Sequence, residues 1–220
     1  MTPRDRKWTF IAAALCWLCF ALIAALVESG RGAAFDAAGL ELWRHGPAAQ
    51  PRGPAWLLEA ARDFTALGGP LLRNLFALAG LVALLFLGER RKAARLGGTV
   101  IGGWLVDVGL KALVGRERPT VVPRLMAVTG SSFPSGHSFN GAVVYIALPL
   151  VFSGFTSRRS VRWTIVSAAV VVTLLIALTR VWLGVHFPTD AIAGWLGGAG
   201  WAFLAAALVP PRPGAAPRDR

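Results

Sequence analysis

The sequence predicts an all-α, polytopic membrane protein with six transmembrane helices, and three observations lead to this prediction. Hydrophobic residues make up 55% of the 220 residues and charged residues only 15%, a balance that is unusual for a soluble protein. The apolar residues gather in six runs, each close to the roughly 20 residues that a spanning helix needs. Lysine and arginine collect between alternate runs, as they do in the cytoplasmic loops of membrane proteins.

Each apolar run predicts one transmembrane helix. The first follows three basic residues, as a secretory signal peptide would, but its length and the poor cleavage site after Val27 favour a retained anchor. The sixth is expected to begin near Phe187, because the residue before a proline avoids the helical conformation. The six predicted spans are Trp8–Val27, Pro70–Leu87, Leu96–Val114, Phe139–Phe155, Trp163–Thr179 and Ala191–Val209.

The basic residues predict which helix ends face the cytoplasm. With six spans, all four basic segments fall on one side, which is therefore expected to be cytoplasmic. They contain Arg4, Arg6 and Lys7; Arg90, Arg91, Lys92 and Arg95; Arg158, Arg159 and Arg162; and Arg212, Arg218 and Arg220. The chain is thus expected to be one membrane domain, with a cytoplasmic N-terminus (1–7), an extracytoplasmic amphipathic segment (28–69), a helical core (70–209) and a flexible cytoplasmic tail (210–220).

The segment between the first two spans contains a predicted amphipathic helix. Pro54 is suited to the first turn of a helix, and apolar residues then recur at helical spacing. They are Trp56, Leu57, Ala60, Ala61, Phe64 and Leu67, with Glu59, Arg62 and Asp63 on the opposite face. Such a helix either lies in the outer leaflet or packs on the protein as a loop helix, and both alternatives stay open. His45 is interpreted as a surface histidine.

Charge and cysteine content bear on partners and cofactors. A net charge of +12 is compatible with a nucleic-acid partner, but the basic residues lie between apolar runs instead of along one polar face. The expected partner is therefore the lipid bilayer and not nucleic acid. Cys16 and Cys19 form a Cys-x-x-Cys pair, which can be redox-active or half of a zinc site. Without a second pair, they are interpreted as small hydrophobic residues.

Three short polar stretches interrupt the apolar sequence on the predicted extracytoplasmic side. They run from Lys111 to Pro119, from Pro134 to His137, and from Arg180 to Asp190. Together they hold three cations, two histidines, one carboxylate and a Ser-Gly turn. Because charge within apolar segments is costly, its presence usually marks a functional site.

The three stretches resemble the signature of the type 2 phosphatidic acid phosphatase superfamily, in its bacterial membrane branch. That signature is Lys, six residues and Arg-Pro; then Pro-Ser-Gly-His; then Ser-Arg, five residues, His, three residues and Asp. Every position matches except the first of the third stretch, where Thr179 replaces Ser and retains the hydroxyl. The resemblance covers roughly residues 73–208 and implies a membrane lipid phosphatase.

A phosphate-binding group of residues is expected from these stretches. The guanidinium groups of Arg118 and Arg180 match phosphate oxygens in pairs, and Lys111 adds a point charge. Ser135 and Gly136 come directly before a predicted helix, whose free N–H groups favour an anion. We therefore expect all five residues to bind phosphate.

The catalytic residues implied by the resemblance are His186, His137 and Asp190. His186 is expected to attack phosphorus and form a phosphohistidine, with Asp190 four residues later fixing its tautomer. His137 is expected to protonate the leaving alkoxide and then to activate water. Two histidines and a carboxylate can also hold a metal, but the three converging cations would repel a divalent ion, so no metal and no other cofactor is expected.

Other charged residues near the stretches receive more modest interpretations. Arg73, Arg116 and Arg124 are interpreted as arginines that snorkel from helix ends. Asp107 lies one helical turn before Lys111 and is expected to pair with it, either to tune the site or to satisfy a charge. The segment from Asp63 to Gly69 is interpreted as a structural turn that at most supports the site.

The predicted activity is hydrolysis of a lipid phosphate at the outer face of a bacterial cytoplasmic membrane. Undecaprenyl diphosphate, phosphatidylglycerol phosphate and phosphatidic acid are the candidate substrates. A phosphotransferase would use the same phosphohistidine with a lipid or sugar acceptor. A non-enzymatic transporter that uses buried charges is the alternative from a different class, and it would not require either histidine.

Overall fold

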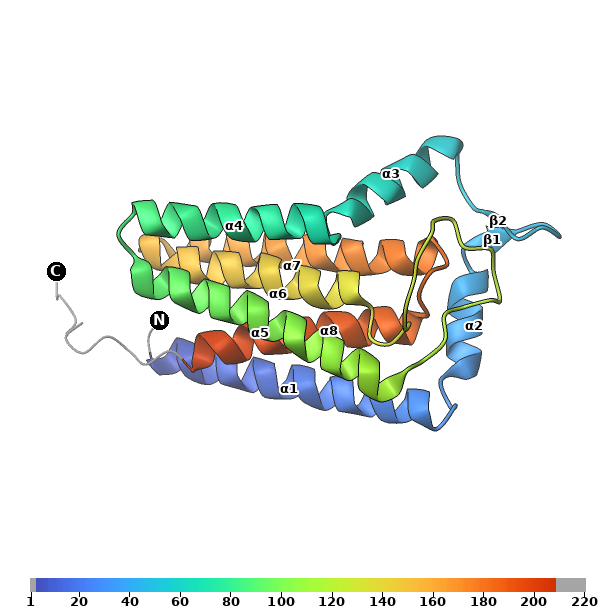
Figure 1. Ribbon diagram of the computed structural model, residues 1–220, viewed down its shortest axis with the longest axis horizontal. Coiled ribbons are helices and arrows are strands. Elements are labelled where there is room, and N and C mark those ends of the chain that lie inside the picture. The colour runs from blue at the N-terminus through green and yellow to red at the C-terminus, as the bar shows by residue number, and fades with distance from the viewer. Residues whose placement is uncertain (1–2, 209–220) are drawn as a thin grey trace.

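The computed structural model describes residues 3–208, with side chains from Asp5 onward (Figure 1). The helices are α1 (Pro3–Glu28), α2 (Ala33–Glu41), α3 (Ala55–Ala66), α4 (Pro70–Phe86), α5 (Arg90–Val114), α6 (Gly136–Phe152), α7 (Arg159–Trp182) and α8 (Pro188–Ala207), with a 3₁₀ turn η1 (Ser153–Phe155) after α6. Two short antiparallel strands, β1 (Arg44–His45) and β2 (Gln50–Pro51), form a hairpin between α2 and α3.

All six predicted spans form helices. α5 begins at Arg90 and α7 begins at Arg159, ahead of the predicted starts at Leu96 and Trp163. The basic residues that were assigned to the preceding loops form the first turns of these helices. Pro188 is the first residue of α8 and Phe187 is its extended N-cap, as the proline predicted. The predicted cytoplasmic tail, residues 210–220, lies outside the described residues.

Within residues 3–208, four helical segments are long and apolar enough to cross a membrane: Asp5–Glu28, Arg90–Val114, Gly136–Phe155 and Arg159–Trp182. A fifth span results if α3 and α4, which meet at an angle of 44°, are counted together. α8 is not among these segments, because glycine and alanine occupy many of its positions and lower its hydropathy. The chain is therefore a mostly helical protein with four or five candidate membrane spans.

α8 occupies the interior of the bundle, where its main neighbours are α1 and α6. Its small residues allow this position. A Cβ atom on Gly198 would lie 2.1 Å from the Phe139 carbonyl oxygen of α6, so only glycine permits this approach. Close helix contact through small residues is typical of packing within membranes. Large apolar side chains such as Leu22 and Leu75 remain exposed on the outer helices, where lipid would cover them.

The two ends of the bundle differ in charge and in structure (Figure 1). The basic starts of α1, α5 and α7 lie at one end. The other end carries α2, the hairpin, α3 and the N-termini of α6 and α8. All three polar stretches lie at this second end, which agrees with the predicted separation of basic loops from the candidate site.

The segment between α1 and α4 is more structured than the sequence indicated. The predicted amphipathic helix is confirmed as α3, with Pro54 at its N-cap. α3 packs on α7 through buried Ala61, while Trp56 is exposed. α2 and the hairpin were not predicted, because α2 is short and rich in alanine and glycine. His45 is exposed, as predicted.

Candidate active site

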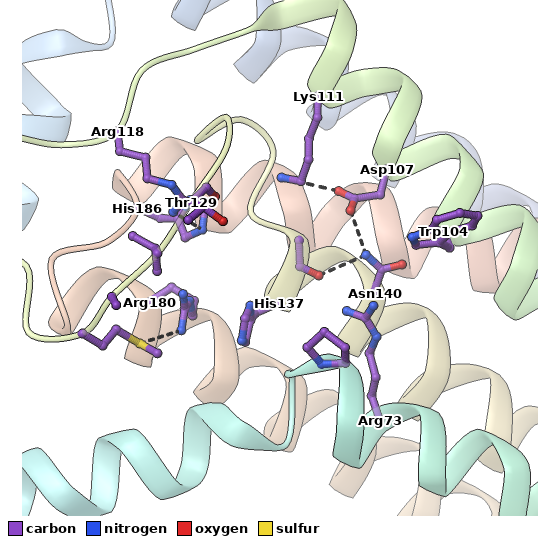
Figure 2. Close-up of a pocket in the computed structure, with 15 residues that line it drawn as sticks. Arg73, Trp104, Asp107, Lys111, Arg118, Thr129, His137, Asn140, Arg180 and His186 are labelled. Atoms are coloured by element: carbon purple, nitrogen blue, oxygen red, sulfur yellow. Dashed lines mark hydrogen bonds and ion pairs between the residues drawn. The ribbon is translucent and has the colours of Figure 1, made fainter.

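A cavity of about 320 Å³ opens at the end of the bundle that carries the polar stretches (Figure 2). Six of the eight predicted site residues line it: Lys111, Arg118, Gly136, His137, Arg180 and His186. The other two, Ser135 and Asp190, are fully buried behind its wall. The fold therefore brings together residues that lie up to 79 positions apart in the chain (111 to 190).

Helix ends place these side chains. α5 ends at Val114, and the positive φ of 61° at the following Gly115 lets the chain leave the helix one turn after Lys111. α6 begins at Gly136, so His137 stands in its first turn. Arg180 lies in the last turn of α7, and His186 lies in the short connection to α8.

The His186 ring is almost fully buried and is held from two sides. Its Nε2 lies 3.1 Å from Arg118 Nη1. Because a guanidinium can only donate, Nε2 carries the lone pair and the ring proton belongs on Nδ1. Nδ1 lies 3.4 Å from Ser132 Oγ and 3.7 Å from Asp190 Oδ2. The ring therefore directs its basic nitrogen toward the cavity-lining Arg118 and its N–H toward the carboxylate.

Ser132 lies between His186 and Asp190. Its hydroxyl donates to Asp190 Oδ2 over 2.5 Å, whereas the direct distance from His186 Nδ1 to that oxygen exceeds hydrogen-bond length. The backbone N–H of Phe187 also donates to Asp190 Oδ2, over 3.0 Å. Ser132 was not predicted, because it stands two residues outside the Pro-Ser-Gly-His stretch and belongs to no motif. It joins the carboxylate to the ring.

Arg116 holds the other oxygen of Asp190. Its Nη1 donates to Asp190 Oδ1 and its Nη2 to Asp36 Oδ2, both over 2.7 Å. Thr189 completes the group, since its N–H and hydroxyl both donate to Asp36. The interpretation of Arg116 as a snorkelling residue is therefore wrong. Asp36 on α2 is fully buried. It fixes the Arg116 guanidinium, and Arg116 in turn fixes the carboxylate of Asp190.

Electrostatics follow from this geometry. Burial lowers the pKa of His186 to about 4, with Asp190 acting against the shift and Arg180 and Arg118 adding to it. The ring is thus neutral at neutral pH and keeps the Nε2 lone pair. Burial also opposes the charge of Arg116, but the carboxylates of Asp36 and Asp190 more than offset this and raise its pKa.

His137 has different surroundings. It is only partly buried, it lines the cavity, and no hydrogen bond joins its ring to another described residue. Gly68, in the turn before α4, lies against the His137 backbone closely enough that an added Cβ would be 3.1 Å from its carbonyl oxygen. The turn between α3 and α4 therefore supports the position of His137, whose imidazole lines the cavity without a hydrogen bond to another described residue.

The three predicted phosphate-binding cations reach the cavity from three elements. Arg180 is buried and donates from Nη1 to Thr65 Oγ1 over 3.0 Å, while its Nε has no partner. Lys111 donates to the Pro134 carbonyl and lies 3.8 Å from Asp107. Arg118 donates to carbonyls on either side of the cavity, at 2.9 Å to Gly130 and Val185 and 2.8 Å to Thr129.

The two residues of the Ser-Gly turn, Ser135 and Gly136, differ in their contacts and in their exposure to the cavity. The hydroxyl of Ser135 accepts a hydrogen bond from Ser138 over 3.0 Å, and its N–H donates to the Asp190 carbonyl. Accepting from Ser138 leaves the O–H of Ser135 free to donate, but Ser135 is fully buried, so a phosphate contact would require this O–H to point into the cavity. Gly136 lines the cavity, where a Cβ would lie 3.2 Å from Asp107 Oδ2 and 3.3 Å from Lys111 Cε. Glycine at this position lets α6 approach both side chains.

Arg73 and Asp107 also line the cavity. Arg73 is buried in α4, so its interpretation as a snorkelling residue is wrong as well. The predicted pairing of Asp107 with Lys111 is confirmed. Asp107 has a further partner in Asn140, whose amide donates to Oδ2 over 2.8 Å. Arg124 is exposed, in agreement with its predicted role. The Thr179 hydroxyl donates to the Ile176 carbonyl within α7 and does not line the cavity.

Potential metal ligands do not gather at the site. Within residues 3–208, no group of three or more His, Cys, Asp or Glu side chains is placed to hold a metal ion. The carboxylate nearest the histidines, Asp190, already accepts from Arg116, Ser132 and Phe187. The site is arranged around cations and imidazoles.

Comparison with known proteins agrees with this geometry. The family model of the PAP2 superfamily matches residues 92–213, which is more than half of the chain and includes all three polar stretches. The chain belongs to the PAP2 superfamily. The predicted phosphate-binding residues, together with His137 and His186, fall within the part that the PAP2 family model matches.

Three curated PAP2 relatives show local similarity to this chain. Phosphatidylglycerophosphatase B of Bacillus subtilis is 40% identical over 94 residues, covering 41% of this chain and 45% of the relative. Lipid A 1-phosphatase of Rhizobium etli is 32% identical over 120 residues, covering 50% and 47%. Undecaprenyl-diphosphatase of Sulfolobus acidocaldarius is 34% identical over 76 residues, covering 34% and 32%. The chain thus matches less than half the length of each relative.

Two solved structures resemble the fold of most of this chain. The crystal structure of a transmembrane PAP2-type phosphatidylglycerolphosphate phosphatase from Bacillus subtilis superposes with a TM-score of 0.78 at 26% identity, covering 88% of this chain and 93% of that one. The crystal structure of LpxE from Aquifex aeolicus has a TM-score of 0.56 at 22% identity, covering 77% and 91%. The second likeness concerns the fold alone.

Proposed function

We propose that this PAP2 protein is a membrane lipid phosphatase that forms a phosphohistidine on His186. One observation carries the proposal: the buried His186 ring has its Nε2 beside Arg118 at the cavity wall, and Asp190 lies behind its Nδ1. Membership of the PAP2 superfamily and the names of the relatives, all phosphatases of lipid phosphates, support it.

The phosphate group binds among Lys111, Arg118 and Arg180. Three positive charges match a phosphomonoester dianion, and because Arg180 is buried and Lys111 and Arg118 are partly shielded from water, the attraction is stronger than at an open surface. Arg118 Nη1 turns from His186 Nε2 to a phosphate oxygen, which frees the lone pair for attack. The N–H of Gly136, at the start of α6, adds a donor, and the Ser135 O–H, which its bond with Ser138 does not use, adds another when it points into the cavity.

Phosphoryl transfer then proceeds in two steps. His186 Nε2 forms a bond to phosphorus as the ester P–O bond breaks, and protonated His137 gives its proton to the leaving alkoxide. The resulting imidazolium is stabilised by Asp190 through Nδ1–H and Ser132. Neutral His137 next takes a proton from water, whose oxygen attacks phosphorus and breaks the P–N bond. Inorganic phosphate leaves and both histidines return to their starting states.

The membrane arrangement is part of the proposal. α8 completes six spans with α1, α4, α5, α6 and α7, in one domain that places the basic helix starts in the cytoplasm. The cavity then opens on the outer face of a bacterial cytoplasmic membrane, near the level of the lipid phosphates. α2, the hairpin and α3 form the extracytoplasmic segment above it. The lipid tail stays in the bilayer, so the substrate enters sideways between helices.

The activity is tested by measuring free phosphate release from the three candidate lipids by the purified protein in detergent, in parallel reactions with and without EDTA. The proposal predicts release with at least one lipid, and none above background from His186→Ala. His45→Ala is the matched control, because His45 is exposed and lies outside the cavity. Equal release by wild type and His186→Ala, or release that EDTA abolishes, would contradict the proposal. Release that appears only with an added acceptor would indicate a phosphotransferase.

A further inference from the structure

The cavity continues past the proposed phosphate site to a second polar layer, formed by Arg73 of α4, Asp107 of α5 and Asn140 of α6 (Figure 2). Asp107 precedes Lys111 by four residues, and Asn140 follows His137 by three. Each therefore lies about one helical turn, or ~5.4 Å, further along its helix. In the proposed orientation this direction leads into the membrane, toward the body of a lipid substrate.

Asp107 presents an unused acceptor in this layer. Its side chain is almost fully buried, and Oδ2 accepts from Asn140. Oδ1 has no hydrogen-bond partner, because Lys111 lies 3.8 Å away and donates to the Pro134 carbonyl instead. Leaving a buried carboxylate oxygen without a donor is costly. A ligand hydroxyl in the cavity would satisfy it.

Arg73 presents unused donors across the cavity. Only 9% of the residue is exposed, and its one hydrogen bond within the described chain goes to the Gly68 carbonyl at 3.4 Å. A guanidinium has five N–H donors, so most of them remain for a ligand. Figure 2 shows the side chain reaching from α4 toward Asn140. A buried arginine at this depth is expected to serve an anion.

We propose that Arg73 and Asp107 form a second subsite that recognises the leaving group of the substrate. Arg73 binds a second anionic group, and Asp107 accepts a hydrogen bond from a hydroxyl on the spacer that joins this anion to the scissile phosphate. The preferred substrate class is therefore a lipid whose leaving group carries both a hydroxyl and a second phosphate. This inference rests on the proposed phosphatase function and names its specificity.

The three candidate lipids separate the two contacts. Phosphatidylglycerol phosphate offers a hydroxyl and a second phosphate, undecaprenyl diphosphate offers only a second phosphate, and phosphatidic acid offers neither beside its scissile phosphate. Ratios of kcat/KM between substrates cancel effects that a variant exerts on all three. The variants are Arg73→Gln and Asp107→Asn, with Arg124→Gln as the matched control, because Arg124 is an exposed arginine outside the cavity.

Arg73→Gln is expected to lower the kcat/KM ratios of phosphatidylglycerol phosphate and undecaprenyl diphosphate to phosphatidic acid by about tenfold, as for the loss of a charged hydrogen bond. Asp107→Asn is expected to lower only the ratio for phosphatidylglycerol phosphate, by a similar factor. Unchanged ratios would overturn the subsite while leaving the phosphatase intact. Failure of the wild type to release phosphate from any lipid would overturn the function and the subsite together.

A wild-type measurement keeps the inference testable if a variant does not fold. Glycerol 3-phosphate and propyl phosphate are small monoesters of similar length that differ in their hydroxyl groups. As competitive inhibitors of the wild type, glycerol 3-phosphate is expected to have a several-fold lower Ki, because its hydroxyl reaches Asp107. Equal Ki values, or tighter binding of propyl phosphate, would overturn the assignment of Asp107.

Discussion

His186 and His137 both line the same cavity, yet their rings differ in hydrogen bonding. The His186 ring has partners at both nitrogens, whereas the His137 ring has none among the described residues. The His186 ring contacts Arg118 on one nitrogen and Ser132 on the other, with Asp190 and Arg116 behind them. The His137 ring has no hydrogen bond to another described residue and is only partly buried. A nucleophile gains from a fixed position, whereas a group that passes a proton to an alkoxide and then takes one from water needs room to turn.

The contrast extends to the groups behind each ring. Asp190 receives hydrogen bonds from three residues, and Asp36 on α2 continues the network outward. On the opposite wall, Arg73 and Asp107 keep unused donors and acceptors. The network behind His186 is hydrogen-bonded within the protein, whereas Arg73 and Asp107 form the wall that we propose binds the leaving group. The following changes test this division.

The largest effect is expected from His186→Ala. Loss of the attacking nitrogen should lower kcat by a factor on the order of 10⁵ to 10⁶, as for other covalent nucleophiles. The loss should be similar for lipid substrates and for an aryl phosphate with a good leaving group, since both need the same attack. Phosphate release quantifies it, and a His186→Ala enzyme that retains a tenth of its activity would remove His186 from this role.

A smaller and more selective loss is expected from His137→Ala. Removing a general acid and base typically costs a factor of about 10² to 10⁴. An aryl phosphate leaves without protonation, so its first step should be largely spared. Burst kinetics with p-nitrophenyl phosphate should show fast release of p-nitrophenol followed by slow turnover. Equal slowing of both steps would contradict the assignment of His137 as the proton carrier.

Arg116→Gln tests the network behind His186. Arg116 is a positioning residue that acts through Asp190, so kcat should fall by about 10- to 100-fold while KM changes little. Arg116→Lys should recover part of the loss, because it restores one charge without the paired contacts. Arg124→Gln serves as the control. A change in KM alone would place Arg116 in substrate binding and end its proposed link to the nucleophile.

The smallest effect concerns pH. His186 must be neutral to attack, and burial lowers its pKa to about 4. Activity should therefore fall only as the pH drops through about 4, where the ring gains a proton, and not near 6.5. The kcat/KM profile of the free enzyme reports this pKa. An acid limb near pH 6.5 that stays in place with substrates of different phosphate pKa would show that His186 is not buried as described.

Much of this architecture was accessible from the sequence. The six helices follow from long apolar runs, and the spacing of three polar stretches predicted six residues that line one cavity. Local pattern also located α3 and the start of α8, because Pro54 and Pro188 act within their own turns. The positions of these helices could be predicted because they depend on residues that are close together in the sequence.

The parts that escaped prediction depend on neighbours in space. Arg116 resembles any arginine after a helix until Asp36, 80 residues earlier, is placed beside it. Asp36 itself was the useful signal, since a carboxylate flanked by alanine and phenylalanine on the site side requires a partner if it is buried. Ser132 carries no motif, and only the fold places it between His186 and Asp190. The sixth span stays a prediction, because the glycines that let α8 enter the bundle lower its hydropathy and leave four or five helices that qualify by length and composition.

The most direct test of the account is to trap the phosphorylated enzyme. Purified protein would be mixed with a ³²P-labelled lipid substrate, quenched in alkali, which preserves phosphohistidine, and digested for peptide mapping. The account predicts label on the peptide that contains His186, increased in His137→Ala because its water step is slow, and absent in His186→Ala. Rapid phosphate release without label on His186, or label that persists in His186→Ala, would contradict a phosphohistidine at this position.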